Sequence, residues 1–397
     1  MFSKNHSGHV VGGTLLVAGT SIGAGMLALP VVTALGGFMP AFFVYFLCWM
    51  FMTCTGLLLL EICLKLPPDA NLVTMAGTYL GNFGKAFAWV LYLFLFYCLS
   101  VAYISGGGSL LGDWLGGGSS WKTCLLFVVF LAPFVYAGAR MVDRLNLFLM
   151  GGLILSYLAF VVVGLPHVKI SSLQTSNWGA SMIALPVIFT SFSYQGVIPS
   201  LTSYLHRDAR KVRIAIIGGT SIAFLIYLLW EFLILGIVPI EGEFGLLNAK
   251  ELGQTAVAPL KHHVAAGSIA SIGQAFAFFA ISTSFLGVTL GLMDFLADGL
   301  QMPKKGMRRL FLALLTFGPP AAIALINPGI FITALVLAGG IGCALLLGFL
   351  PTLLVWIARY GKQGHHGGPI QLAGGRWLLS ALFLFVFLEL VIEMFLI

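Results

Sequence analysis

The most restrictive feature of this sequence is the length of its stretches without Lys, Arg, Asp or Glu. None of these residue types occurs between Lys4 and Glu61. Further such stretches cover 86–112, 145–168, 170–206, 262–293 and 310–358. A membrane-spanning helix needs about 20 consecutive apolar residues, so the first and last stretches can each hold two helices. We therefore expect an integral membrane protein.

Composition excludes the main alternatives. Only 8% of the residues are charged and 59% are hydrophobic, whereas soluble domains carry about 25% charged residues. Soluble enzymes, disulfide frameworks and disordered chains are therefore poor candidates. A membrane β-barrel would need alternating segments of about ten residues, but the apolar runs here are continuous. The fold class we predict is an all-α integral membrane protein.

Turns between the apolar stretches divide the chain into eleven expected spans. They lie near 9–31, 38–62, 86–112, 122–139, 146–166, 181–205, 213–238, 267–296, 309–326, 330–357 and 376–396. The first span is expected to be retained rather than cleaved, because no small-residue cleavage site follows a short apolar region.

The basic residues support this count and set the expected orientation. With the N-terminus in the cytoplasm, the outer loops hold only Lys122, Lys169, Lys250 and Lys261 of the 20 Lys and Arg residues. This asymmetry follows the positive-inside rule and places the C-terminus outside. The net charge of +7 therefore reflects the topology. Contact of the basic residues with anionic membrane lipids explains this charge more simply than binding of nucleic acid does.

Two spans are interrupted near their centres by residues that leave helical geometry at low cost. Span 1 contains Gly19–Gly25 followed by Pro30, and span 6 contains 189–196 between Pro186 and Pro199. Freed backbone N–H groups attract a carboxylate, and freed carbonyls attract an ammonium group or another cation. A zwitterionic amino acid matches both ends.

Each interruption alone also fits ordinary helix packing, through a Gly19-xxx-Gly23 contact or a proline kink. Their positions, however, correspond in two five-helix units of opposite orientation. That pattern is typical of secondary transporters with a substrate site at the midplane.

Two runs carry a resemblance to a known family. The run Gly19-Thr20-Ser21-Ile22-Gly23-Ala24-Gly25-Met26-Leu27-Ala28-Leu29-Pro30, preceded by Gly12-Gly13-Thr14, resembles the first helix of the hydroxy/aromatic amino acid permeases. The run from Ser284 to Asp298 also resembles this family, and the likeness is greatest to its tyrosine-specific branch.

The resemblance implies a LeuT-type 5+5 inverted repeat with discontinuous helices 1 and 6 plus one extra C-terminal helix. The chain would be a single transport domain over 1–397, with repeats near 9–166 and 181–357 and the extra helix near 376–396. The implied function is proton-driven import of an aromatic amino acid, most simply tyrosine, across a bacterial inner membrane. No enzymatic activity, cofactor or metal is implied.

The resemblance also implies which residues bind the substrate, and most of them lie in the two interrupted spans. The backbone of span 1 would hold the substrate carboxylate, at Thr20, Ser21, Ile22, Gly23, Ala24 and Gly25. Span 6 would bind the ammonium group and form the side-chain pocket, through Phe189, Thr190, Phe192, Tyr194 and Gln195. Span 3 would contribute Tyr97, with Cys98 and Tyr103 as further candidates. The sequence names no partner for the substrate phenol.

Acidic and hydroxyl residues inside spans are candidates for coupling and gating. Glu231 lies within an apolar run and would carry the proton, although an interfacial or helix-pairing role stays open. Asp294 would pair with a basic residue of an inner loop or remain solvated. Ser282 and Thr283 would help to form a sodium site or bond to their own helix.

Two outer features complete the sequence-based expectations. Glu389 and Glu393 are expected to be outer-surface charges, and 239–264 is long enough for an extracellular lid.

A membrane-embedded enzyme stays an alternative from a different class, although no catalytic cluster is visible within the spans. A channel would need a repeated filter or charge ring. Within the family, tryptophan, serine, threonine or another neutral amino acid and sodium coupling stay open.

Overall fold

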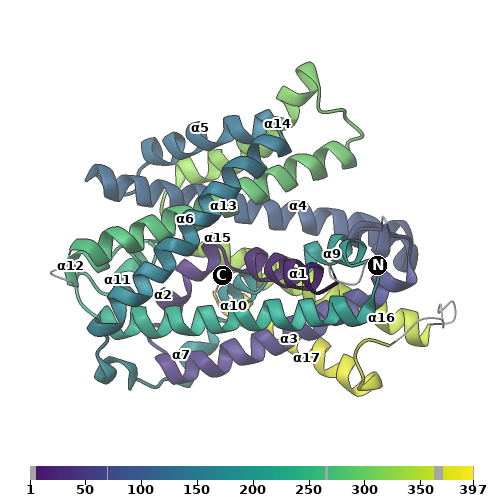
Figure 1. Cartoon of the computed structure of the whole chain (residues 1–397), viewed down its shortest axis with the longest axis horizontal. Helices are drawn as coiled ribbons and strands as arrows, with labels where there is room; N and C mark the ends of the chain where they lie inside the picture. Colours follow the sequence, from purple (N-terminus) through teal and green to yellow (C-terminus); the bar gives the residue numbers. More distant parts are fainter. Residues whose placement is uncertain (1–5, 69, 264–266, 362–369, 397) are drawn as a thin grey trace.

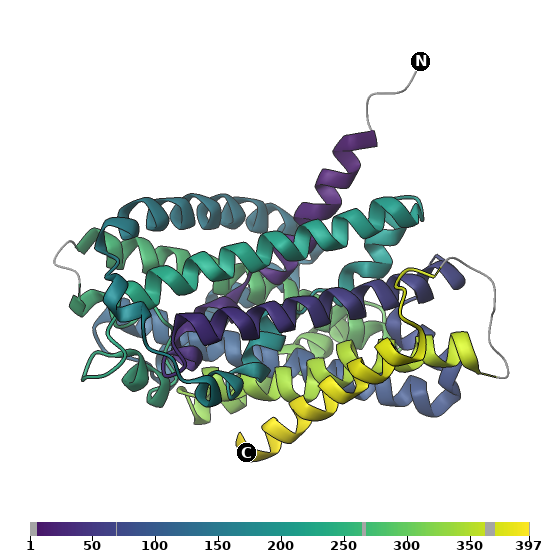
Figure 2. The same cartoon turned by 90° about the horizontal axis from the view of Figure 1, so that it is seen from below.

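A computed structural model of the chain describes residues 6–68, 70–263, 267–361 and 370–396. Within these ranges the regular elements are all helical, and no strand occurs. Figures 1 and 2 show the long helices running approximately along the longest axis of the molecule, packed beside one another as a bundle.

The elements follow one another in the order α1 (His6–Ser21), η1 (Ala24–Leu27), α2 (Leu29–Thr33), α3 (Phe38–Lys65), α4 (Leu72–Leu115), α5 (Trp121–Ala137), α6 (Ala139–Gly164), η2 (Leu165–His167), η3 (Ile170–Leu173), α7 (Trp178–Met182), α8 (Leu185–Ser191), η4 (Gln195–Val197), α9 (Ile198–Tyr204), α10 (Ala209–Ile237), α11 (Leu246–Glu251), α12 (Leu260–His263), α13 (Gly267–Gly299), α14 (Gly306–Ile326), α15 (Phe331–Leu337), η5 (Ala338–Phe349), α16 (Leu350–Tyr360) and α17 (Gly375–Leu396).

The eleven predicted spans all correspond to helical segments. In the described ranges, 8 helices are long and apolar enough to cross a membrane, and α1 forms a further span with η1 and α2 across a bend of 47°. The 17-residue α5 and the interrupted segment from α7 to α9 occupy the two remaining positions. In α4, Gly81 has a φ of 68° and separates a short first helix from the span.

The first interruption lies where the glycines of span 1 predict it. Helix α1 ends at Ser21, and Gly23 is extended, with φ −151° and ψ −160°. The chain then continues through η1 into α2, where Pro30 occupies the first turn. Proline is tolerated there because the first N–H groups of a helix have no partner within the helix.

Span 6 is interrupted in the same manner. Helix α8 ends at Ser191, and the chain leaves helical geometry before η4 and α9. Pro186 and Pro199 lie in the first turns of α8 and α9. The prediction of discontinuous first and sixth spans is thereby confirmed.

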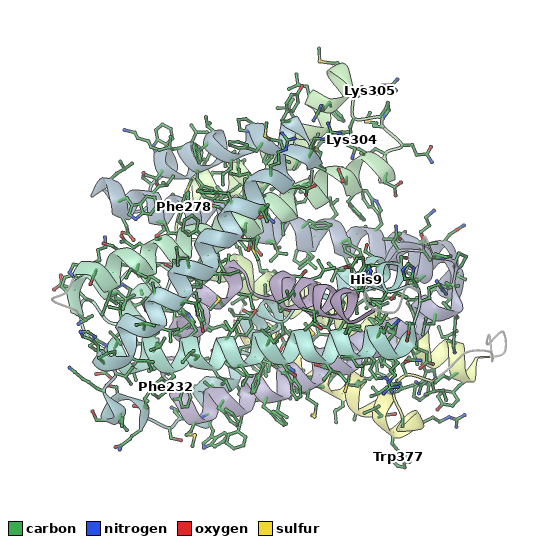
Figure 3. The ribbon with its side chains drawn as sticks, in the orientation of Figure 1. His9, Phe232, Phe278, Lys304, Lys305 and Trp377 are labelled. Carbon is green, nitrogen blue, oxygen red and sulfur yellow. The ribbon has the colours of Figure 1, made fainter. Side chains whose placement is uncertain are left out.

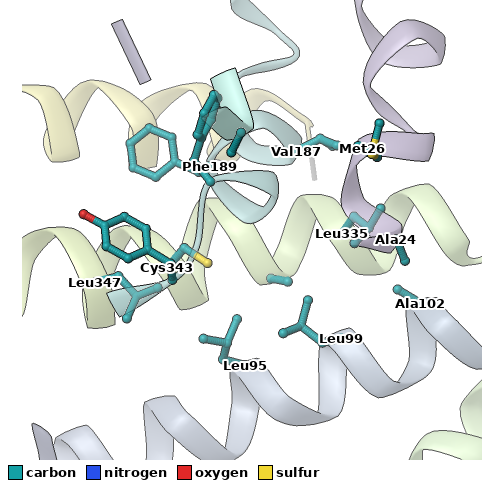
Figure 4. Packing of buried hydrophobic residues seen from close by; sticks show 14 of the residues in the cluster. Ala24, Met26, Leu95, Leu99, Ala102, Val187, Phe189, Leu335, Cys343 and Leu347 are labelled. Carbon is teal, nitrogen blue, oxygen red and sulfur yellow. The ribbon is translucent and has the colours of Figure 1, made fainter. Parts of the chain in front are cut away.

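A third irregularity, which the sequence analysis did not predict, is the π-helix η5 in span 10. A Cβ on Gly339 would lie 1.7 Å from the carbonyl oxygen of Pro186, so only glycine permits this approach of η5 to α8. Apolar side chains of α4, α8, η1 and η5 meet here in one core (Figure 4). The core therefore lies directly behind both interruptions.

Glu389 and Glu393 correct one prediction. They are 0% and 2% exposed, so the expected outer-surface location is wrong. The exposed side of α17 carries Phe387 and Phe395, which are 64% and 87% exposed. An apolar outer side leaves the acidic residues facing the protein, and α17 runs along the side of the bundle (Figure 2).

The segment proposed as a lid, 239–264, is described up to residue 263 and contains α11 and α12. Its Ala256 backbone N–H donates a hydrogen bond of 2.9 Å to the carbonyl of Leu27 in η1. Helix α11 also packs against α2. The segment therefore covers the end of span 1 that follows the break, and its function as a lid stays a prediction.

Candidate functional site

A cavity of about 580 Å³ lies against both interruptions. It reaches from the two breaks along the C-terminal half of α1 and is bounded by α4, α6, α13 and η5. Its wall is mostly apolar and aromatic, with a few polar groups, as in small-molecule sites. It is lined by Leu15, Leu16, Gly19, Thr20, Ile22, Tyr92, Leu95, Phe96, Leu99, Tyr103, Asn146, Met150, Ser193, Tyr194, Gly196, Val197, Thr283, Ser284, Gly287, Val288, Gly291 and Leu347.

The break in span 1 presents backbone donors beside this cavity. The Ala24 N–H donates to the Ser284 hydroxyl at 3.0 Å. The N–H groups of Gly23 and Gly25 form no hydrogen bond within the described residues. Unpaired N–H groups at the start of a helical segment carry partial positive charge. This break can therefore accept an anionic group.

The break in span 6 and the end of α1 present backbone acceptors. The last residues of α1 and α8 are Ser21 and Ser191, and carbonyls at helix ends carry partial negative charge. The hydroxyl of Tyr227 in α10 lies 2.5 Å from the Ser21 carbonyl oxygen and 2.6 Å from that of Ser191. One phenol therefore bridges both breaks.

Sequence reasoning missed Tyr227. A signal was available, because Tyr227 precedes Glu231 by four residues and therefore shares its helix face. The side chain of Tyr227 is 0% exposed. A fully buried hydroxyl between two half-helix ends holds them at a fixed separation.

Three of the predicted substrate residues, Thr20, Ile22 and Tyr194, line the cavity. Ser21 does not, since its hydroxyl donates to the carbonyl of Val17 at 3.2 Å. Gly23 lies at the break itself. The next two residues, Ala24 and Gly25, are buried behind it. Of the six span 1 candidates, the structure thus places Thr20 and Ile22 on the wall of the cavity.

Two of the predicted aromatic residues of span 6 contact protein neighbours. Phe189 packs between Phe51 and Phe385, with ring centroids 5.1 and 5.8 Å away. Phe192 meets the ring of Tyr227 edge-on at 4.9 Å. Both phenylalanines are 0% exposed, so they support the wall from behind it.

Three polar candidates are likewise occupied by the protein. The hydroxyl of Thr190 donates to the Leu335 carbonyl at 2.8 Å. The Gln195 side-chain amide donates to the Thr55 hydroxyl at 3.1 Å, and Tyr97 donates to a backbone carbonyl of α14 at 2.9 Å. Tyr103, rather than Tyr97, lines the cavity from α4. Direct contact of Thr190, Gln195 and Tyr97 with substrate stays a prediction.

Glu231 lies outside the cavity, at the other side of the break. Its side chain is 0% exposed and accepts a hydrogen bond of 2.7 Å from Tyr45 in α3. It is also hydrogen-bonded to Thr33 in α2, and the Thr33 hydroxyl lies 2.7 Å from the Leu29 carbonyl oxygen. The carboxyl group therefore connects α10 to α2 and α3.

The remaining gating candidates have different surroundings. Asp294 pairs with Lys304 at 2.7 Å, with both side chains 48% exposed. Lys304 lies on the loop that projects from the bundle between α13 and α14 (Figure 3). Thr283 donates to the Phe279 carbonyl of its own helix at 2.9 Å, and the buried Ser282 hydroxyl has no partner within the described chain.

Comparison with known proteins identifies the family. Residues 6–393 match the tryptophan/tyrosine permease family. The chain is 35% identical to tyrosine-specific transport system 1 of Haemophilus influenzae, covering 93% of this chain and 92% of that protein. It is 33% identical to a tryptophan-specific transport protein of Pseudomonas aeruginosa, covering 92% of this chain and 89% of that protein.

Solved structures agree on the fold. MhsT in complex with L-phenylalanine is similar with a TM-score of 0.65 and 14% identity, covering 98% of this chain and 99% of that chain. The manganese transporter of Eremococcus coleocola is similar with a TM-score of 0.61 and 14% identity, covering 97% and 85%. Both have the LeuT-type fold that the resemblance implied. The chain belongs to the tryptophan/tyrosine permease family and is a membrane transporter, not an enzyme.

Proposed function

We propose that this chain imports tyrosine with protons across the bacterial inner membrane by alternating access. The observation that carries the proposal is the cavity that touches both breaks. At one break the N–H group of Gly23, next to the cavity-lining Ile22, is unpaired, which suits the substrate carboxylate. At the other, the partly negative end of α8 suits the ammonium group.

The wall of the cavity suits an aromatic side chain. Tyr92, Phe96 and Tyr103 contribute aromatic surface. Asn146 also lines the cavity, and its side-chain oxygen is buried without a hydrogen-bond partner in the described chain. We assign this oxygen as the acceptor for the tyrosine phenol, because a phenylalanine ring would leave it unpaired.

Glu231 is the proposed proton carrier. The Thr33 hydroxyl has one proton and two oxygen neighbours, the Leu29 carbonyl and Glu231. If Glu231 is protonated, it donates to Thr33, and Thr33 donates to Leu29, so every bond is made. Loss of the proton removes one bond and leaves a charge inside the membrane. The protonated state therefore stabilises the attachment of α10 to α2.

The side to which the cavity opens follows from the orientation that the basic residues indicate. With the N-terminus cytoplasmic, the cavity opens inward, since it extends from the breaks along α1, the half of span 1 that precedes its break. The opposite side is closed by the Glu231 contacts and by the bond from Ala256 to Leu27. Movement of α1 and α8 relative to the rest of the bundle would open that side and close the inner one.

The test is uptake of labelled tyrosine into proteoliposomes. An inward proton gradient should drive saturable accumulation that a protonophore abolishes, and excess unlabelled tyrosine should compete. Accumulation that follows only a sodium gradient would refute proton coupling. Competition by tryptophan without competition by tyrosine would assign the cargo to tryptophan instead. A channel would give uptake without saturation, and an enzyme would give none.

A further inference from the structure

We propose that Glu389 and Glu393 of α17 form a second proton-binding site, in which the two carboxyl groups hold at least one proton against η5. The site is separate from Glu231 and from the cavity. The proposal goes beyond the transport function, because proton binding here does not depend on what drives uptake.

The first argument is burial without partners. Glu389 and Glu393 are one helical turn apart and therefore lie on the same face of α17. Their side chains are 0% and 2% exposed. All four carboxyl oxygens are buried and have no hydrogen-bond partner within the described residues. Two ionised carboxylates cannot be stable in such a place.

The second argument is the absence of a compensating cation among the described residues. Cys48 of α3, Cys98 of α4 and Cys343 of η5 are the titratable neighbours that interact electrostatically with the pair. A neutral thiol supplies no positive charge. Helix α8, which also packs on α17, contains no titratable residue.

The basic residues of α16 and α17 are engaged elsewhere. Arg359 of α16 pairs with Glu61 at 2.6 Å. Arg376, at the other end of α17, lies over the Tyr360 ring at 4.8 Å. Neither Glu389 nor Glu393 has an ion pair in the described chain. A proton is the ligand that neutralises one carboxylate of the pair and gives it an O–H donor.

The third argument is the close contact between the Glu393 carboxyl group and the backbone of η5. A Cβ on Gly340 would lie 2.1 Å from a carboxyl oxygen of Glu393 and 2.3 Å from its carboxyl carbon. The carboxyl group thus rests directly on the backbone of η5. Twelve-residue π-helical segments such as η5 are rare, and π-turns occur frequently at functional sites.

The same π-helix connects the acid pair to the substrate side. At the neighbouring residue of η5, Gly339 lies against the Pro186 carbonyl of α8. Thr190 of α8 donates to the carbonyl of Leu335 in α15, three residues before η5 begins. Ionisation of the pair would require water or a cation between α17 and η5. It would therefore disturb the element that supports α8.

The test is infrared difference spectroscopy of the full chain in lipid nanodiscs during a pH titration. The protonated-carboxyl C=O band should lose a component in Glu389→Gln and in Glu393→Gln that remains in Glu231→Gln. A matched control is Glu241→Gln, because Glu241 is an exposed glutamate of the loop after α10. This control should leave the band unchanged.

Gly340→Ala supplies a second measurement that removes no carboxyl group. The added methyl group should displace the Glu393 carboxyl group and shift the frequency and titration midpoint of the same component. Bound aromatic amino acid is not needed, so failure of transport would not affect this outcome. The proposal is overturned if single Gln variants at both positions keep the wild-type band. It is also overturned if added sodium, rather than acid, changes the spectrum of the pair.

Discussion

Replacement of Tyr227 by phenylalanine tests whether one hydroxyl sets the geometry of both breaks. The variant keeps the ring and its contact with Phe192 but removes the group that lies 2.5 and 2.6 Å from the carbonyls of Ser21 and Ser191. The hydroxyl has one proton, so at least one of the two carbonyls then loses its donor in a fully buried site. A buried polar group left unpaired costs about 1–3 kcal/mol.

That free-energy cost can be expressed as a change in the affinity for tyrosine. If the half-helix ends separate to find other partners, the population with a binding-competent geometry falls by about 5- to 150-fold. The apparent Kd for tyrosine rises by the same factor. The assay is equilibrium binding of labelled tyrosine to the purified chain in nanodiscs, together with the thermal midpoint of unfolding.

Tyr157→Phe is the matched control. Tyr157 also donates to a carbonyl of α10, that of Ile226 at 3.0 Å, and is 8% exposed. It touches neither break. Both variants should lower thermal stability, but only Tyr227→Phe should weaken tyrosine binding. Equal Kd values for the two variants would refute the assignment of Tyr227 as a positioning residue.

Four further predictions follow from the site. Glu231→Gln should abolish proton-driven accumulation and leave counterflow exchange partly intact; normal accumulation would exclude Glu231 as the proton carrier. Gly23→Val should block tyrosine binding, because a Cβ there would lie 2.5 Å from the hydroxyl of Ser284, and a wild-type Kd would contradict this. Asn146→Ala should weaken tyrosine binding by about 5- to 150-fold while phenylalanine competes as before, and equal losses for both would reject Asn146 as the phenol acceptor. Asp294→Asn should change the stability by less than about 1 kcal/mol, since its ion pair is half exposed, and thermal unfolding checks this.

The sequence predicted the spans and both breaks because these depend on local chemistry. Charged residues are excluded from lipid, so the stretches without them mark the spans. Gly23, Pro30 and Pro186 act on the backbone where they stand. No long-range contact is needed to locate such features.

Side-chain directions could not be predicted in the same way. A helix that is apolar all round gives no periodic signal for its inner face, so Phe189 could be assigned to the pocket although it packs against α3 and α17. After a break, the directions in which the side chains point no longer follow from the helix before it. Tyr194 therefore lines the cavity although its hydroxyl donates to the Met52 carbonyl of α3, while the amide of its neighbour Gln195 bonds to α3 and does not line the cavity.

Glu389 and Glu393 were misplaced for a related reason. Proximity to the chain end suggested an aqueous outer surface, but α17 ends beside η5. Their four-residue spacing within an apolar run was the informative signal, because it places both on one face of a membrane helix.

The bond between Ala256 and Leu27 has a consequence for the connection between α10 and α13. Both partners are backbone atoms, so ordinary substitutions at either residue preserve the bond and only proline at 256 removes it. Since η1 directly follows the first break, any tilt of that segment pulls this connection with it. We therefore expect the spacing between α10 and Ala256 to matter for transport, and a single-residue insertion there should slow turnover.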